Sequence, residues 1–390
     1  MSISRFGLLP RLLVAIVLGI VLGPFLPLPV VRLFATVSSL FSQLLQFLIP
    51  LIIIGLVTPA IAQIGRGAGR LVLLTAAIAY GSTVCAGLLS YATGSTVFPL
   101  IIRPGEGLSA VSTEAQVTPF FTISIPPMVD VMSALVFSFM LGLGIAFFSP
   151  SGLKGIFQEF KDIVVKTIET VILPLLPLYV FGLLLGMAHT GQTVRILNTF
   201  LGIICVIFVL HVVLLLLQFS VAGIVTRRNP LRLLAGMMPA YVTALGTSSS
   251  AATIPVTLRC ALCNGVSQGI AGFVIPLCAT IHLSGSTLKI VACALALLLM
   301  QGHHPSFSLF LGFILMLGIM MVAAPGVPGG AIMAALGLLG SMLGMGEEEQ
   351  ALMIALYITM DNFGTACNVT GDGAIALVVD RIRKGVVNGE

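Results

Sequence analysis

The sequence predicts an all-α membrane protein with eight transmembrane helices and two re-entrant helical hairpins in one membrane domain, residues 1–390. Only 8% of the 390 residues are charged and 58% are hydrophobic, whereas a soluble domain carries about 25% charged residues. Apolar stretches recur along the whole chain, so we expect no separate soluble domain. The net charge of +5 lies in short clusters between these stretches. Without a basic stripe interleaved with aromatic residues, it does not favour binding to nucleic acid.

Six stretches before residue 228 are apolar enough to cross a bilayer, which takes about 20 residues. They are residues 12–26, 34–62, 71–100, 129–148, 164–188 and 196–225. Basic clusters at residues 5–11, 66–70, 154–166 and 227–232 fall at alternate ends of these stretches, which places the N-terminus in the cytoplasm. A last cluster at residues 381–384 places the C-terminus there too. We therefore expect a multi-pass protein of the cytoplasmic (inner) membrane, embedded in the lipid bilayer.

Two later segments are too short and too interrupted to be ordinary spans. The arms 234–247 and 251–261 on either side of Ser248, Ser249 and Ser250 reach only about 15 to 21 Å as helices. They predict a first hairpin at about 233–261, although a kinked ordinary span is an alternative. A second hairpin at about 307–345 contains the break Pro325-Gly-Val-Pro-Gly-Gly330, which cannot continue a helix.

A broken helix at residues 269–300, with a polar patch at 280–287, and a last helix at 351–379 complete the eight spans. Two interrupted hairpins beside broken helices indicate inverted repeats with a site near the bilayer midplane, as in secondary transporters. The sequence has no Walker A motif. We therefore expect transport driven by a gradient and no enzyme activity on this chain.

The last helix carries the chemistry. Asp361, Thr365, Asn368 and Asp372 recur at i, i+4, i+7 and i+11, which places them on a stripe about 60° wide. A carboxylate at the membrane centre costs about 2.5 to 3.5 kcal/mol, and no Lys or Arg shares this face. We expect a bound cation, a proton or a substrate ammonium to supply the missing charge. The alternative is that Asp372 is hydrated near the cytoplasmic end and Asp361 is protonated.

Four stretches resemble the dicarboxylate/amino acid:cation symporter family, which includes glutamate and neutral amino acid transporters. They are residues 246–259, 274–280, 326–330 and 365–372. The resemblance in architecture covers nearly the whole chain. It implies a homotrimer whose protomers each have a scaffold part, at about 7–65 and 124–190, and a mobile transport part. The transport part, at about 70–100, 193–228 and 229–380, would slide across the membrane as an elevator, with the second hairpin as its gate.

The resemblance also implies a role for individual residues. Asp361 matches the carboxylate that holds a substrate ammonium, and Thr365 and Asn368 match the groups that meet its α-carboxylate. The remaining groups of the substrate site are Ser248, Ser249, Ser286, Val327, Gly329 and the space at Gly364. One sodium site matches Asp372, Asn368 and the carbonyl of Cys278. A second sodium site matches the carbonyls of Thr280, Met321, Val322 and Ala324.

Two departures from the family pattern refine the expectation. Members that take acidic substrates place an Arg where this chain has Gly364 or Thr247. Without that Arg an acidic side chain would be buried unpaired, so we predict a neutral amino acid substrate, with Gly364 leaving room for a larger side chain. Ser284 replaces the carboxylate of a third sodium site, which polar groups such as Ser82 and Thr83 otherwise complete. We expect that site to be lost.

Two nearby residues leave alternatives open. Lys289 either replaces the missing ion electrostatically, reaching the carboxylates of the last helix, or snorkels towards the membrane surface. His282 either titrates and permits coupling to H+, or is a core histidine with satisfied hydrogen bonds.

Together these observations predict a symporter of neutral L-amino acids coupled to Na+, with no organic cofactor and fewer ions than the acidic members use. The alternatives are a proton-coupled symporter, a symporter of acidic amino acids or dicarboxylates, and an uncoupled channel-like protein that conducts anions. A dicarboxylate is disfavoured because it would bring no ammonium to Asp361.

Overall fold

A computed structural model describes residues 8–65, 70–102, 117–148, 151–190, 193–324 and 329–388. Within these ranges the regular structure is helical, and no strand occurs. The all-α prediction is therefore confirmed for this part of the chain. The predicted site residue Val327 lies outside the described residues.

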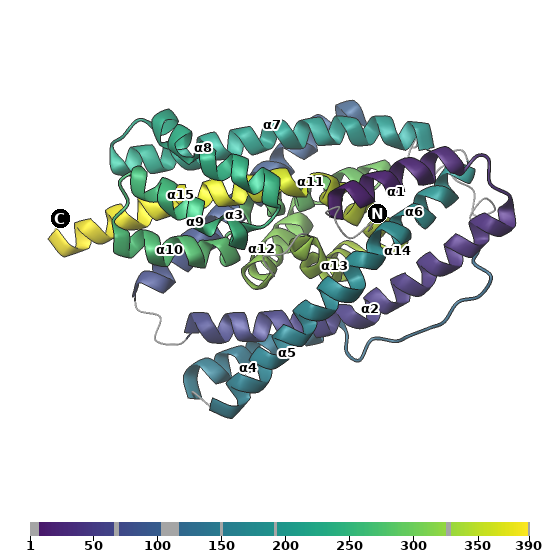
Figure 1. The fold of residues 1–390 in the computed structure, drawn as a ribbon, viewed down its shortest axis with the longest axis horizontal. Coiled ribbons are helices and arrows are strands. Elements are labelled where there is room, and N and C mark those ends of the chain that lie inside the picture. Colours follow the sequence, from purple (N-terminus) through teal and green to yellow (C-terminus); the bar gives the residue numbers. More distant parts are fainter. Residues whose placement is uncertain are drawn as a thin grey trace, which may run out of the picture.

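One group of helices comes from the first half of the chain (Figure 1). Its members are α1 (Leu8–Leu22), α2 (Leu28–Gly65), α4 (Val131–Phe148), α5 (Ser151–Thr167) and α6 (Leu173–His189). A π-helical turn, Ile168–Ile172, joins α5 to α6. Helix α2 packs against α4, α5 and α6, and α1 packs against α6. Pro50 and Pro59 lie inside α2, which apolar membrane helices tolerate because neighbouring groups compensate the lost hydrogen bonds.

The other group of helices includes α11, all of whose side chains are buried. Its members are α3 (Arg70–Ile101), α7 (Thr193–Thr226), α8 (Pro230–Thr247), α9 (Ser250–Cys263), α10 (Gln268–Ile281), α11 (Ser284–Met300), α12 (Phe307–Ala323), α13 (Gly330–Leu343), α14 (Glu347–Thr359) and α15 (Asp361–Asn388). Helix α11 contacts α3, α7, α12, α13, α14 and α15. A helix buried on every side must be apolar nearly throughout, so the polar residues of α11 require partners on its neighbours.

Short breaks interrupt the helices around this centre. Helices α8 and α9 contact each other and are separated by Ser248, in the left-handed region at φ 53°, and Ser249. His282 and Leu283 separate α10 from α11. These breaks expose backbone groups that need other partners, and the polar site forms where several of them meet.

The last break corrects a prediction. Residues 351–379 were expected to form one continuous helix, but α14 ends at Thr359 and α15 begins at Asp361. Met360 between them has φ −110° and ψ 10°, outside the helical region. Its carbonyl accepts hydrogen bonds from the Gly364 amide at 3.1 Å and from Lys289 Nζ at 3.2 Å. The bond from Gly364 is the first backbone bond of α15, and Lys289 is a second donor to the same oxygen.

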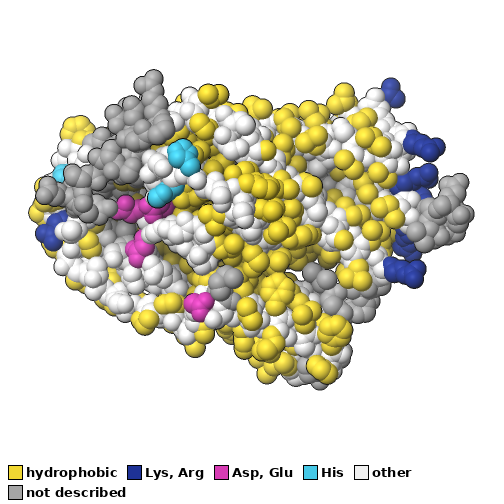
Figure 2. Space-filling view, turned by 180° about the vertical axis from the view of Figure 1, so that it is seen from behind, with side chains coloured by type: hydrophobic (Ala, Val, Ile, Leu, Met, Phe, Trp, Pro, Cys, Tyr) yellow, Lys and Arg dark blue, Asp and Glu magenta, His cyan; other side chains and the backbone are white. Residues whose placement is uncertain are grey.

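Hydrophobic side chains cover most of the face seen in Figure 2, and the visible Lys and Arg side chains gather mainly at the end where α15 terminates. Among the described residues, five helical runs are long and apolar enough to cross a membrane. They are Leu28–Ala62, Arg70–Ile101, Gly152–His189, Phe200–Thr226 and Gln268–Met300. The protein is therefore a multi-pass membrane protein. Three finer features remain predictions: the total of eight transmembrane spans, the re-entrant insertion of the two hairpins, and the division into scaffold and transport parts.

Candidate functional site

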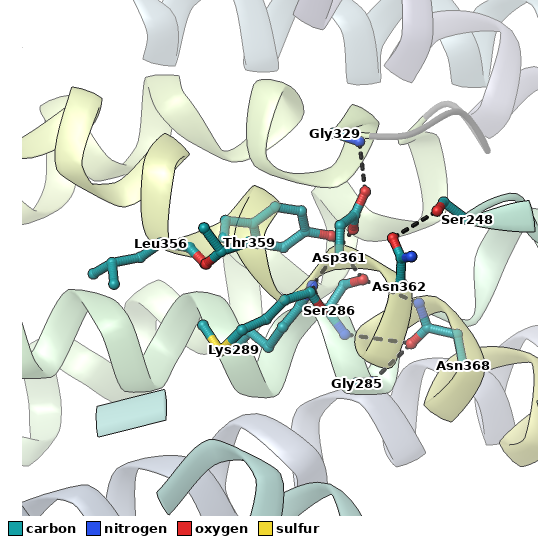
Figure 3. A network of polar contacts seen from close by, with 12 residues as sticks. Ser248, Gly285, Ser286, Lys289, Gly329, Leu356, Thr359, Asp361, Asn362 and Asn368 are labelled. Atoms are coloured by element: carbon teal, nitrogen blue, oxygen red, sulfur yellow. Dashed lines mark hydrogen bonds and ion pairs between the residues drawn. The ribbon is translucent and has the colours of Figure 1, made fainter. Parts of the chain in front are cut away.

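Asp361 lies where the break between α14 and α15 meets the start of α13 (Figure 3). It is 5% exposed and is the first residue of α15, where the positive end of the helix dipole favours a carboxylate. Its Oδ2 accepts a hydrogen bond from the backbone N–H of Gly329 at 2.8 Å. Gly329 precedes α13 and has φ 74°, a conformation that favours glycine. The second predicted hairpin thus contacts the predicted ammonium ligand through its backbone.

Lys289 is the second charged residue of this site. Its side chain is fully buried, and Nζ lies 3.4 Å from Asp361 Oδ1. Nζ also donates to the carbonyl of Met360 at 3.2 Å and lies 3.7 Å from the ring centroid of Tyr357, a favourable cation–π position. The alternative in which Lys289 snorkels to the surface is therefore wrong. The alternative in which its ammonium reaches a carboxylate of the last helix agrees with the structure.

Gly364 makes room for this lysine. A Cβ atom at position 364 would lie 2.5 Å from both Cε and Nζ of Lys289, closer than any real contact. The space beside Gly364, which was expected to accommodate a larger substrate side chain, is filled by Lys289 in this structure. The sequence has Gly364 where family members with acidic substrates can have an Arg. In this chain the side chain of Lys289, from α11, lies at that position.

Asn368 fixes the start of α11. Its Oδ1 accepts hydrogen bonds from the backbone N–H groups of Gly285 and Ser286, at 2.8 and 3.3 Å. Its Nδ2 donates to Ser286 Oγ at 3.0 Å, and Tyr357 donates to the same oxygen at 2.9 Å. These contacts satisfy amides that a helix start leaves free. Thr365 is 7% exposed and lies on α15 between Asp361 and Asn368. Sequence reasoning missed Tyr357, although its polar hydroxyl stands one turn before Asp361 in an apolar segment.

The tip between α8 and α9 contacts the residue after Asp361. Ser248 Oγ donates to Asn362 Oδ1 at 2.6 Å, and Asn362 Nδ2 donates to the carbonyl of Leu245 at 2.9 Å. Ser249 caps α9 by accepting a hydrogen bond from the Ala252 N–H at 3.3 Å. Sequence reasoning missed Asn362, whose signal was an amide side chain directly beside the predicted carboxylate.

Asp372 belongs to a second buried cluster, three turns further along α15. Its Oδ1 lies 2.9 Å from His282 Nδ1, and both side chains are almost inaccessible. His282 Nε2 lies 3.0 Å from Ser82 Oγ. His282 is thus a buried histidine with a partner on each ring nitrogen, which agrees with the core-histidine alternative.

The residues at the third sodium site, which was expected to be lost, are hydrogen-bonded to other protein groups. Gln218 Nε2 donates to Ser82 Oγ and to Ser284 Oγ, each at 3.0 Å. A Cβ atom at Gly371 would lie 2.7 Å from Gln218 Oε1 and 2.9 Å from His282 Cε1, so glycine is needed there. Sequence reasoning missed Gln218, which is an uncommon polar residue about two turns before the end of the long apolar helix α7.

Both carboxylates therefore have a basic partner within the chain. The sequence shows no Lys or Arg on this face of the last helix, and the structure brings Lys289 and His282 to it from elements that precede α15 by tens of residues. A stripe on one helix gives no information about side chains that reach it from another helix.

The predicted sodium ligands divide into two sets. The carbonyl of Cys278 accepts a hydrogen bond from the His282 N–H at 2.9 Å, and Asp372 and Asn368 have the partners given above. Thr280 lies in the last turn of α10, and Met321 and Val322 lie in the last turn of α12, before its C-cap Ala324.

Helices α10 and α12 contact each other. Helix C-termini carry partial negative charge, and the predicted ligands of the second set lie at the C-terminal ends of these two helices. Over the part of the chain that the structure describes, no cluster of three or more His, Cys, Asp or Glu residues forms a metal site.

A cavity of about 300 Å³ lies apart from these clusters, between α2, α6 and α14. Ser38, Tyr179, Glu347 and Glu348 are among its lining residues. Burial, followed by the charges of Glu349 and Glu347, raises the pKa of Glu348. None of the residues that line it belongs to the Asp361 cluster.

Charged side chains buried at helix breaks within an apolar helical protein are characteristic of a membrane transporter. The comparison with known families agrees. The sodium:dicarboxylate symporter family matches residues 8–382, and the chain belongs to that family. It is a family of transporters and not of enzymes.

Three relatives illustrate the similarity. Excitatory amino acid transporter 3 of Mus musculus is 30% identical over 264 residues, which are 66% of this chain and 49% of that protein. Excitatory amino acid transporter 3 of Homo sapiens is 31% identical over 268 residues, with coverage of 66% and 49%. Excitatory amino acid transporter 1 of Ambystoma tigrinum is 28% identical over 265 residues, with coverage of 66% and 48%. The chain thus spans about half the length of these curated relatives.

Proposed function

We propose that this transporter is a symporter of neutral L-amino acids coupled to Na+. The observation that carries the proposal is the balanced charge of the site, in which Asp361 and Lys289 form a buried pair 3.4 Å apart. A zwitterionic substrate adds one positive and one negative group to this pair and leaves the site neutral. An acidic substrate would add a further buried negative charge, which is costly without a partner.

In this proposal the substrate ammonium binds Asp361, and its α-carboxylate meets Thr365 and Asn368. The tips with Ser248, Ser249, Val327 and Gly329 close over it, and Ser286 and Gly364 lie beside its side chain. The contacts of Asp361 and Asn362 support this arrangement. Gly329, before α13, donates to the Asp361 carboxylate, and Ser248, between α8 and α9, donates to the next residue, Asn362.

Sodium is the coupling ion in the proposal and is carried as cargo. The carbonyls of Thr280, Met321, Val322 and Ala324 form one site, supported by the positions of these residues at the C-terminal ends of α10 and α12. The other sodium site consists of Asp372, Asn368 and the Cys278 carbonyl. When the ion binds there, the Asp372 carboxylate leaves His282 and contacts the ion instead. A hydrogen-bond network supports the absence of a third sodium site; its members are Gln218, Ser82, Ser284 and His282.

We also propose a homotrimer with the scaffold and transport parts described above. The packing of α2 against α4, α5 and α6, and of α15 against α7, α8, α9, α10 and α11, supports this division. The scaffold part would stay fixed while the helices around α11 move.

A second candidate is a symporter of acidic amino acids. Lys289 Nζ lies where the side chain of residue 364 would begin, so it offers a cation to a substrate side-chain carboxylate if it leaves Asp361. The relatives are named as excitatory amino acid transporters, which agrees with this candidate.

Uptake into proteoliposomes tests the proposal. We expect sodium-dependent accumulation of at least one labelled neutral amino acid, and uptake of Asp, Glu and succinate at least tenfold lower. Accumulation driven by a proton gradient without sodium would reject the coupling ion. Preference for Asp or Glu would select the second candidate, and current without accumulation would indicate a channel.

Asp361→Asn should reduce uptake at least a hundredfold, because the ammonium loses its carboxylate. Since this change leaves Lys289 without its partner, Asp361→Asn combined with Lys289→Met is measured in parallel. Asp162→Asn on the exposed face of α5 is the matched control and should retain uptake. Unchanged uptake in both Asp361 variants would reject the assignment of this carboxylate.

A further inference from the structure

Lys289 is a buried cation that the transport proposal does not need for holding the substrate. Its ammonium lies against Asp361 Oδ1, the carboxylate to which we assign the substrate ammonium. The inference below rests on that assignment. We propose that Lys289 is a tethered counter-ion that occupies the ammonium position in the empty transporter and withdraws when substrate arrives.

The burial of Asp361 requires such a counter-ion. With 5% of its surface exposed, Asp361 has little access to water, and a buried unpaired carboxylate is strongly destabilising. When substrate leaves, the chain itself must neutralise the carboxylate, or a cation from solution must do so. Lys289 supplies a positive charge that remains in the protein and needs no binding step.

The other contacts of Lys289 allow it to withdraw. Nζ lies 3.4 Å from Asp361, at the long end of a hydrogen bond, but 3.2 Å from the Met360 carbonyl and 3.7 Å from the Tyr357 ring centroid. Two of its three partners therefore do not involve the carboxylate. When a substrate ammonium takes Asp361 Oδ1, Lys289 keeps a carbonyl and an aromatic face, and its charge is not left without partners.

The surrounding groups fit a site in which Lys289 balances the charge of Asp361. Asp361 Oδ1 faces Lys289, and Oδ2 accepts the N–H of Gly329 from the tip of the second helix pair. Glycine at position 364 leaves the space that the lysine fills. The contact with Gly329 and the charge compensation by Lys289 thus occur together on one carboxylate.

This arrangement separates two modes of transport. Exchange of external for internal substrate requires only that the loaded site crosses the membrane. Net uptake also requires the empty site to return, and returning an uncompensated carboxylate through the membrane is costly. Removal of the lysine should therefore impair net uptake and leave exchange largely intact.

The test compares the two modes for Lys289→Met in proteoliposomes, with the labelled amino acid that the unaltered protein accumulates. We expect net uptake to fall at least tenfold and exchange to fall less than threefold. Internal K+ or methylammonium at high concentration should restore net uptake of the variant at least threefold, because either cation can reach Asp361. Lys384→Met, at an exposed lysine paired with Asp380 in the last turns of α15, is the matched control and should change neither mode.

Equal losses in both modes without rescue, or no loss in either, would overturn the inference. A measurement on the unaltered protein applies even if the variant does not fold: replacing internal K+ by N-methyl-D-glucamine should change net uptake less than twofold. A requirement for internal K+ would show that the lysine does not replace a cation from solution. Failure of the unaltered protein to carry any neutral amino acid in either mode would instead reject the proposed function.

Discussion

Two helix pairs end in tips that contact adjacent residues at the start of α15, but they do so with different chemistry. The first tip, residues 245–249, makes two side-chain hydrogen bonds with the neutral amide of Asn362. The second tip, at Gly329, makes a backbone hydrogen bond with the charged carboxylate of Asp361. Both anchors therefore lie within one peptide unit of each other on α15.

The difference suggests which tip responds to substrate. Asn362 is neutral and has no assigned role in binding, so its contacts with the first tip do not depend directly on the charge of Asp361. Asp361 is shared by the second tip, by Lys289 and, in our proposal, by the substrate ammonium. The second tip is thus coupled to the charge on Asp361, which supports its expected role as the gate.

The largest expected effect is loosening of the first tip by Asn362→Ala. This change removes two hydrogen bonds, each worth about 0.5 to 1.5 kcal/mol. A loss of about 2 kcal/mol corresponds to roughly a thirtyfold change in the opening equilibrium. Hydrogen–deuterium exchange in peptides spanning residues 240–256 should therefore accelerate about thirtyfold. Exchange at residues 329–335 should stay the same, and acceleration of both regions would refute independent anchoring.

The next largest effect concerns the second tip and requires both charges of the pair to be removed. Asp361→Asn in a Lys289→Met background replaces a charged hydrogen-bond acceptor by a neutral one without stranding a buried ammonium. A bond to a charged group is worth about 1.5 to 3 kcal/mol and a neutral bond about 0.5 to 1.5 kcal/mol, a difference near 1.3 kcal/mol.

Exchange at residues 329–335 should then accelerate roughly eightfold relative to Lys289→Met alone. Exchange at residues 240–256 should not respond. If the first tip loosened to the same extent, the carboxylate would be stabilising the whole centre and not the second tip in particular.

The residues around these two tips also show which parts of the site could be predicted from the sequence. Asp361, Thr365, Asn368 and Asp372 follow from helical spacing, because all four lie on one element. Lys289 and Gln218 reach the same site from other helices, and the sequence carries no direct measure of such distances. The break at Met360 was missed because Tyr357 to Asp361 contains no glycine or proline. What stabilises the break, a lysine from α11 on the Met360 carbonyl, becomes visible only in three dimensions.

The smallest effect tests whether the hydroxyl or the backbone of Ser248 fixes the first tip. Ser248 has φ 53°, in the left-handed region, which costs a residue with a side chain about 1 to 2 kcal/mol and costs glycine little. Ser248→Ala loses the hydrogen bond to Asn362 and keeps the backbone cost, so exchange at residues 240–256 should accelerate about fivefold, for a loss near 1 kcal/mol.

Ser248→Gly loses the same bond but is relieved of a comparable backbone cost. Its exchange should therefore stay within about twofold of the unaltered protein, because the two contributions nearly cancel. Equal acceleration in the Ala and Gly variants would mean that the left-handed backbone contributes nothing to the balance. The first tip would then be held by the Asn362 side chain alone, whereas the second tip is held through the backbone of Gly329.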